Sequence, residues 1–144
     1  MLRLTKKTDY GIIALIYLHT HRSRVVSARE ISEKFGVPLP ILSNIMKSLS
    51  RERLVQSVRG TNGGYQLLRD PEKIKLTQVI EALEGPFHLT ECLGHDGQTD
   101  GCACQISVSC PVWKPLLQVH RRIEDLLDGV TIASLAPTVQ AGTP

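Results

Sequence analysis

The sequence predicts a mainly α-helical protein with a small β-hairpin, in which a winged helix-turn-helix precedes a long dimerisation helix. Two short amphipathic helices joined through a glycine-containing turn, with a glycine-rich hairpin directly after them, predict the winged helix-turn-helix. A seven-residue repeat of apolar residues nearer the C-terminus predicts the long helix. The 144 residues are 42% hydrophobic and 22% charged, which is typical of a folded globular chain rather than a disordered one.

The first predicted helix covers residues 5 to about 21, because its apolar residues recur with helical rather than alternating spacing. Ser27 lies three residues before Glu30, a capping-box pattern that begins a second, short helix, and Gly36 ends this helix. A third helix is predicted from residue 39 or 40 to residue 53. Its expected apolar face comprises Ile41, Leu42, Ile45, Met46 and Leu49.

Two short extended runs, residues 54–59 and 64–68, follow the third helix. Between them lies Gly60-Thr61-Asn62-Gly63, whose glycines and asparagine permit the positive φ angles of a tight hairpin. We interpret this hairpin as the wing. A phosphate-binding nucleotide loop is excluded, because no Gly-Lys-Ser/Thr follows the turn and no strand leads through it into a helix.

Further along the chain, a short helix is predicted over residues 77–83, before a loop over residues 87–109 that is unusually long for a compact domain. The last helix begins near Pro111, and Pro115 either starts it or kinks it. Its apolar residues form a heptad repeat: Val112, Leu116, Val119, Ile123 and Leu126. This stripe fits either a core helix of the same subunit or a helix that pairs two subunits. We favour the second, because few other segments remain for it to pack on.

Charge is divided unevenly along the chain. Residues 1–75 carry 14 lysines and arginines against six acidic residues, a net charge of +8, whereas residues 76–144 carry three against eight, a net of −5. The basic half is therefore expected to face a polyanion. The apolar run 10–18 is far shorter than the roughly 20 residues that cross a bilayer, and Asp9 directly before it does not fit a signal peptide. We expect a cytoplasmic protein without a membrane partner.

Double-stranded DNA is the polyanion that a basic winged helix fits, because Lys and Arg neutralise its phosphates. The N-terminal residues of the second helix of the motif reach base edges in the major groove. Ser43 and Asn44 can hydrogen-bond bases, and asparagine suits adenine. Lys47 and Arg51 suit phosphates, and Arg59 at the hairpin tip suits the adjacent minor groove. The candidate DNA contacts are Ser27, Pro40, Ser43, Asn44, Lys47, Arg51, Arg59 and Thr61.

All four cysteines, Cys92, Cys102, Cys104 and Cys110, fall within 19 residues. In a reducing cytosol such clusters are more often metal ligands or redox sensors than disulfides. Structural zinc sites usually contain pairs such as Cys-x2-Cys, which this segment lacks. The wider spacing favours an iron–sulfur cluster, [2Fe-2S] or [4Fe-4S], with zinc and a thiol redox switch as alternatives. Cys110 precedes a predicted helix, whose dipole would favour a thiolate or an anionic cluster.

Several segments resemble the IscR/NsrR-type transcriptional regulators: LRLTKKTDYG (2–11), VRGTNGGYQL (58–67) and IEALEGPFHLTEC (80–92). The stretches CPVW (110–113) and DGVTIASLA (128–136) resemble most the SUF-system iron–sulfur assembly regulators. The resemblance covers roughly residues 1–136. It implies a homodimeric repressor or dual regulator of cluster-biogenesis genes that binds a palindromic operator and whose DNA affinity follows the state of its own cluster.

The family pattern implies which residues hold the cluster. Cys104 and Cys110 match the five-residue gap between its last two cysteines, and Cys92 matches the first through its TEC context. The gap from Cys92 to Cys104 is longer than usual and Cys102 is additional, so Cys102 can replace or join Cys104. Some members use a histidine three residues after the last cysteine, but that position is tryptophan here. In nitric-oxide-sensing members an aspartate of the partner's first helix is the fourth ligand, and Asp9 matches it. Cys102 and Asp9 are thus rival fourth ligands.

We therefore expect four parts: a winged-helix DNA-binding domain (1–86), a cysteine-containing cluster-binding loop (87–110), a dimerisation helix with a C-terminal segment (111–136) and a disordered tail (137–144). The predicted function is a cluster-controlled DNA-binding regulator and not an enzyme, because no catalytic arrangement stands out. One alternative is a winged-helix regulator whose cysteines bind zinc or sense nitric oxide or oxidants. Another is a small electron-transfer iron–sulfur protein, which has no need of the helix-turn-helix, wing or +8 charge.

Overall fold

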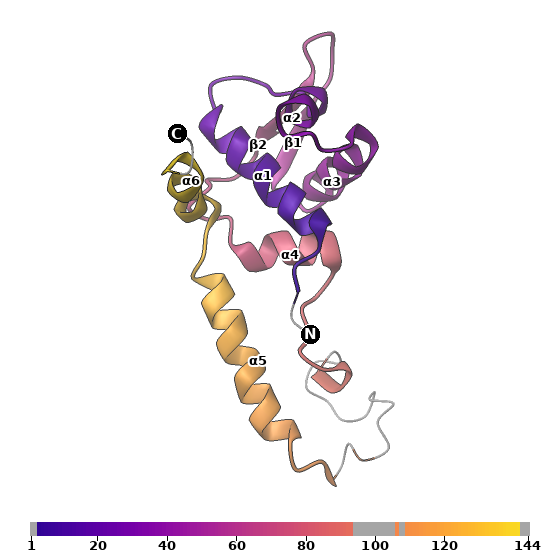
Figure 1. Cartoon of the computed structure of the whole chain (residues 1–144), viewed down its shortest axis with the longest axis vertical. Coiled ribbons are helices and arrows are strands. Elements are labelled where there is room, and N and C mark those ends of the chain that lie inside the picture. The colour runs from indigo at the N-terminus through magenta and orange to yellow at the C-terminus, as the bar shows by residue number, and fades with distance from the viewer. Residues whose placement is uncertain (1–2, 94–105, 107–108, 142–144) are drawn as a thin grey trace.

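The computed structural model describes residues 3–93, 106 and 109–141. Figure 1 shows a winged helix at one end of the molecule, with one long helix extending away from it. The elements are α1 (Lys6–Thr20), α2 (Ala28–Phe35), α3 (Leu39–Arg51), β1 (Val55–Val58), β2 (Gly64–Leu67), α4 (Leu76–Glu84), the short 3₁₀ helix η1 (Glu91–Leu93), α5 (Trp113–Asp128) and α6 (Ile132–Ala141). The predicted mainly α-helical fold class with a hairpin is confirmed.

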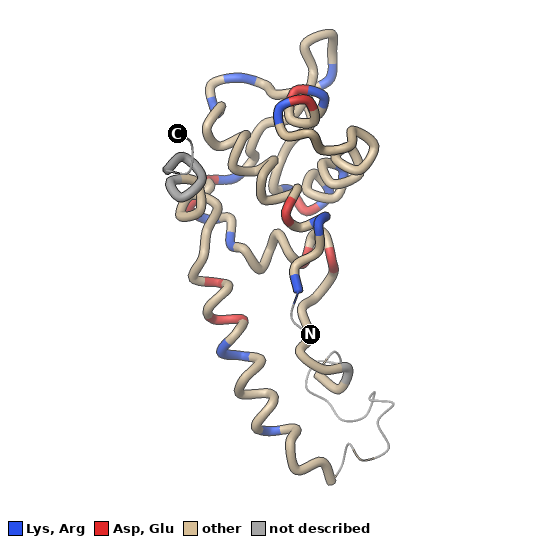
Figure 2. The backbone as a smooth tube through the Cα atoms, in the orientation of Figure 1, with Lys and Arg blue, Asp and Glu red and all other residues tan. Residues whose placement is uncertain are grey.

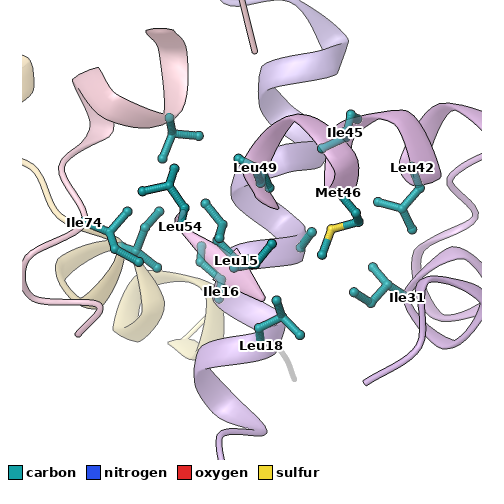
Figure 3. Close-up of a cluster of buried hydrophobic side chains, with 14 of the residues drawn as sticks. Leu15, Ile16, Leu18, Ile31, Leu42, Ile45, Met46, Leu49, Leu54 and Ile74 are labelled. Carbon is teal, nitrogen blue, oxygen red and sulfur yellow. The ribbon is translucent and has the colours of Figure 1, made fainter. Parts of the chain in front are cut away.

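One apolar core holds the winged helix together (Figure 3). Leu15 of α1 lies at its centre, and α3 contributes a fully buried face. Burying each such leucine or isoleucine side chain stabilises the fold by roughly 1.5–3 kcal/mol. The largest side chains that are almost completely buried are Leu15, Leu18, Ile31, Leu42, Ile45, Met46, Leu49, Leu54, Ile74 and Ile132.

The turn between α2 and α3 follows the prediction. The backbone N–H of Glu30 donates to Ser27 Oγ at 3.1 Å, so Ser27 caps α2. Gly36 ends α2 with φ of 67°, a left-handed conformation that glycine adopts without strain. Only half of the predicted capping box forms, because the Glu30 carboxylate binds Arg24 and Tyr17 instead of turning back to the cap.

The wing is an antiparallel hairpin in which Val55 pairs with Leu67 and Val58 pairs with Gly64. Gly60 takes up the turn with φ of 130°. A third segment joins the hairpin, since Val26 exchanges backbone hydrogen bonds of 3.0 and 2.7 Å with Tyr65. A Cβ on Gly64 would overlap the carbonyl oxygen of Val26. Glycine at position 64 therefore allows the wing to lie against the chain that enters α2.

Helix α3 ends at Arg51, two residues before the predicted residue 53. One side chain of its expected apolar face is exposed rather than buried. Leu42, Ile45, Met46 and Leu49 are completely buried, but Ile41 is 45% exposed. Periodicity places Ile41 at the edge of the apolar stripe, and the neighbouring helices do not cover that edge. Ile41 therefore belongs to the surface of α3.

Helix α5 begins at Trp113, so Pro115 is its third residue and not its start. Pro115 lies in the first turn, where the missing amide costs little. In the described part of the chain, His120 is the one buried residue of α5. Val119 and Leu126 of the heptad repeat are 45% and 69% exposed.

None of the helices among the described residues combines the length and apolar character that a bilayer span requires.

Helix α6 returns to the winged helix, against α1. Ile132 and Ala136 belong to the same core as α1, so this core is not confined to residues 1–86. The chain before α6 runs beside the chain before α4, where Leu76 N–H donates to Val130 O at 2.8 Å and Ile132 N–H donates to Ile74 O at 3.0 Å. The backbone of α6 continues to Ala141, where we expected a disordered tail from residue 137. Residues 142–144 lie outside the described residues.

Candidate DNA-binding surface and cysteine segment

The predicted DNA contacts on α3 form one exposed stripe. Pro40, Asn44, Lys47 and Arg51 are exposed and recur at intervals of four, three and four residues, which places them on one side of the helix. This side lies opposite the buried face of α3. Ser43, at the edge of the stripe, is half-buried. The helix thus presents hydrogen-bonding groups in its first turns and cations farther along.

Ser27 has a structural role that sequence reasoning did not separate from its candidate DNA contact. Its hydroxyl oxygen accepts the N-cap hydrogen bond from the Glu30 backbone. The hydroxyl proton can still be donated, and it lies at the N-terminus of α2, where the helix dipole favours an anion such as a phosphate. Capping and phosphate contact are therefore compatible at this residue.

The candidate contacts in the wing, Arg59 and Thr61, are exposed. They lie in the connection between β1 and β2, which projects at the same end of the molecule as α2 and α3 (Figure 1). Lys and Arg occur over this end and at the projecting hairpin (Figure 2). The structure thus gathers the α3 stripe, the start of α2 and the wing at one basic end.

A network that the sequence did not reveal fixes α2 to α1. Arg24 binds the Glu30 carboxylate through both terminal nitrogens, at 2.5 and 2.8 Å, and the Tyr17 hydroxyl donates to Glu30 Oε1 at 2.8 Å. The hydrogen bond from Arg24, together with that from Tyr17, lowers the pKa of Glu30 to about 2. The acceptor Glu30 raises the pKa of Tyr17. Residues 24 and 30 share no helical spacing, so periodicity carried no signal for this pair.

Two of the four cysteines lie in the described residues. Cys92 is in η1 and Cys110 lies three residues before Trp113, the first residue of α5, and both cysteines are half-buried. Cys102 and Cys104 lie outside the described residues. No group of three or more metal-binding side chains is present within the described ranges. Asp9, the rival fourth ligand, lies half-buried in the first turn of α1.

The chain that enters the cysteine segment is tied to α1. Thr8 donates to Glu84 Oε1 at 2.8 Å, Thr5 donates to the same oxygen, and Lys7 Nζ donates to Leu83 O at 2.5 Å. The hydrogen bond from Thr5, ahead of that from Thr8, holds the pKa of Glu84 below its usual range. Gly11 allows this close approach, since a Cβ there would overlap Leu83.

The far end of α5 is tied to the start of α4. Lys75 Nζ lies 2.6 Å from Asp128 Oδ2, and the Thr77 hydroxyl donates to Asp128 Oδ1. The hydrogen bond from Lys75, ahead of that from Thr77, lowers the pKa of Asp128. Helix α4 is therefore bound to α1 at its C-terminal end and to α5 at its N-terminal end.

His120 connects the middle of α5 to the start of the cysteine segment. Its ring stacks on Phe87, with 5.3 Å between the ring centroids, and its Nε2 lies 3.3 Å from Glu124 Oε1. The heptad pattern does not predict this contact, because a histidine between heptad positions usually faces solvent. The stacking holds α5 beside the chain that leads to Cys92.

A winged helix with a basic end that carries an exposed second helix and a projecting hairpin is a DNA-binding protein. The model of the Rrf2 family, described as Iron-dependent Transcriptional regulator, matches residues 4–138. The regulator IscR of Sodalis glossinidius is 35% identical over 135 residues, which cover 93% of this chain and 78% of the relative. The chain therefore belongs to the Rrf2 family and is a transcriptional regulator.

Solved structures agree with this assignment. IscR of T. potens has a TM-score of 0.69 and 30% identity, and the match covers 99% of this chain and 93% of that one. CymR, the global cysteine regulator of B. subtilis, has a TM-score of 0.73 and 25% identity, over 96% and 98% of the two chains. The resemblance to IscR-type regulators is confirmed, and these relatives are regulators rather than enzymes.

Proposed function

We propose that this regulator controls iron–sulfur cluster assembly genes, chiefly as a repressor, and that an iron–sulfur cluster of its own sets its affinity for DNA. The observation that carries this proposal is the position of the cysteine segment. Cys92 and Cys110 bracket a segment whose preceding chain is tied to α1 through Glu84 and whose following helix is tied to α4 through Asp128. The names of the IscR relatives and of the family support a role in iron-dependent regulation.

The proposed ligands are Cys92, Cys104 and Cys110, with either Cys102 or Asp9 of the partner subunit as the fourth. Thiolates suit an iron–sulfur cluster, and the half-buried Cys92 and Cys110 offer two of them. When bound, a [2Fe-2S] or [4Fe-4S] cluster supplies a centre that oxidants, nitric oxide or iron shortage can alter. The residues 87–110 are thus the proposed sensor loop.

The proposed DNA contacts are the α3 stripe, Ser27 and the wing. The first turns of α3 enter the major groove, where Ser43 and Asn44 reach bases and Pro40 packs against the groove. Lys47 and Arg51 neutralise phosphates, Ser27 donates to one, and Arg59 with Thr61 follows the minor groove. The exposure of most of these side chains at one basic end supports this arrangement.

Helix α5 is the proposed dimerisation helix. Its heptad residues Val119 and Leu126 are exposed in the single chain, and their apolar surface fits the same surface of a second copy. A symmetric dimer presents two copies of α3, which fits a palindromic operator. This division leaves the basic end free for DNA.

The cluster is tested by purifying the protein without oxygen and quantifying iron, sulfide and zinc per chain. We expect a brown protein with at least two irons and two sulfides per chain, since [2Fe-2S] is the smaller of the two clusters considered. Cys110→Ser should lose most of the iron. Cys102→Ser and Asp9→Ala, compared side by side, identify the fourth ligand, because only the true ligand's removal changes the visible spectrum. A colourless protein with stoichiometric zinc contradicts the proposal.

The switch is tested by measuring DNA affinity of the cluster-loaded and cluster-free forms across a salt series. Equal affinities at every salt concentration contradict it. The likeness to CymR supports a second candidate, a regulator whose cysteines act as thiols, since one solved CymR is an oxidized form. In that case DNA affinity should respond to thiol oxidation in a protein without iron.

A further inference from the structure

Ile41 is an exposed apolar side chain beside the stripe of α3 that carries Asn44, Lys47 and Arg51. It is the third residue of α3 and is 45% exposed, whereas Leu42 next to it is completely buried. Single exposed isoleucines are common on protein surfaces and need no explanation by themselves. The place of Ile41 is informative, because it lies in the first turn of the helix whose N-terminal residues read bases.

Ile41 and Asn44 share one side of α3. Three residues along an α-helix correspond to a rotation of about 60° between the side chains and a rise of about 4.5 Å. Both side chains are exposed, and Asn44 also begins the side of α3 on which Lys47 and Arg51 follow. The first turns of α3 therefore present an apolar group and an amide side by side, with cations for phosphates farther along.

Thymine carries the one apolar group on the base edges of the major groove, its 5-methyl group. We propose that Ile41 packs against this methyl group and selects thymine at one position of each half-site. The proposal rests on the proposed entry of α3 into the major groove. Ser43 and Asn44 are proposed to recognise bases through hydrogen bonds. Ile41 would recognise a base through an apolar contact.

The spacing of the two side chains locates the thymine. Ile41 and Asn44 are separated by about 4.5 Å along the axis of α3, and successive base pairs of DNA are separated by about 3.4 Å. Asparagine suits adenine, so the thymine read by Ile41 should lie one or two base pairs from an adenine read by Asn44. The operator is thus expected to contain a short A/T step in each half-site.

The test begins with selection of binding sequences from a random duplex library by the full chain, purified without oxygen. Each thymine of the selected sequence is then replaced singly by uracil, which removes only the methyl group. We expect one position per half-site at which uracil lowers the affinity about three- to five-fold, the value for one buried methyl group. Uracil at the other thymines should change the affinity little.

Ile41→Ala should bind the thymine and uracil duplexes at that position equally, and Ile41→Val should keep most of the preference. Leu68→Ala is the matched control, because Leu68 is 48% exposed but lies outside α3. It should discriminate as the wild type does, and far-UV circular dichroism checks that each variant is folded.

Two outcomes overturn the role of Ile41 but leave the proposed entry of α3 into the major groove intact. One is a selected sequence without a methyl-sensitive thymine, and the other is unchanged discrimination between thymine and uracil by Ile41→Ala. The second would mean that Ile41 contacts sugar or supports the helix. If the chain selects no sequence at all, the entry of α3 into the groove fails together with the role of Ile41.

Discussion

The buried hydroxyl of Thr8 donates a hydrogen bond of 2.8 Å to Oε1 of Glu84, although the two residues are 76 positions apart. Thr8 lies in the first turn of α1, one residue before Asp9, and Glu84 is the last residue of α4. The bond therefore joins the helix that carries one proposed cluster ligand to the chain that leads to Cys92. Removing the Thr8–Glu84 hydrogen bond should lower the free energy of unfolding and change how DNA affinity responds to the cluster.

Thr8→Val should lower the free energy of unfolding by about 0.5–1.5 kcal/mol, because valine keeps the shape but loses the hydrogen bond. Urea unfolding at pH 7 measures this change. Thr61→Val is the control, since Thr61 is exposed at the wing and has no hydrogen bond to another described side chain. An equal loss in both variants would contradict a special role for the Thr8–Glu84 bond.

Glu30 gives the fold a defined pH dependence. Its pKa of about 2 in the folded protein lies below the value of about 4.3 expected when unfolded, so its ion pair stabilises fully above pH 4.3 and less as the pH falls toward 2. Glu30→Gln should therefore cost no more than about 1 kcal/mol at pH 7, because the pair is partly exposed, and the difference should shrink between pH 4.3 and 2.

Unfolding measured from pH 7 to pH 3 in wild type and variant checks this expectation. Glu33→Gln on the same helix is the control, as Glu33 is exposed and forms no ion pair among the described residues. A stability difference between Glu30→Gln and wild type that stayed constant down to pH 3 would exclude the proposed titration.

Gly64→Ala should separate the wing from the chain before α2. The added Cβ would overlap the Val26 carbonyl, and relieving that overlap should cost about 1–3 kcal/mol. Amide hydrogen exchange of Tyr65, whose N–H donates to Val26, should become faster. Gly129→Ala is the control, because a Cβ there would meet its nearest atom at 3.4 Å, an ordinary contact.

Leu126→Glu should convert the proposed dimer to a monomer by placing a charge in the apolar seam of α5. Sedimentation velocity measures the change in mass. Lys114→Glu provides a comparison on the opposite side of α5, where the mass should not change. If Leu126→Glu kept the mass of the wild type, α5 would not be the dimerisation helix.

Local patterns in the sequence were sufficient for most of the winged helix. The Ser27 cap, the left-handed Gly36 and the turn at Gly60 depend on residues within a few positions, so sequence reasoning located them. Contacts between distant residues were not accessible in this way. Thr8 with Glu84 and Lys75 with Asp128 join residues that share no period, and only the folded chain brings them together.

For the candidate site, sequence reasoning identified Asn44, Lys47 and Arg51 on the exposed side of α3 but placed Ile41 in the core. A period of 3.6 residues defines the centre of an apolar stripe better than its edges, because coverage at an edge depends on how the neighbouring helices cross. The contribution of Ile132 to the core was missed for a related reason: one apolar residue after a long helix does not indicate which element it meets.

The return of α6 to the core changes how the molecule can be divided. Ile132 and Ala136 complete the core that α1 begins, so the segment between α4 and α6 is an insertion within one folding unit and not a module added to its end. Both ends of this insertion are attached to the same body, at Glu84 and at Asp128. A change in the distance between the two ends of this insertion would therefore move the winged helix at both attachments, α1 through Glu84 and the start of α4 through Asp128.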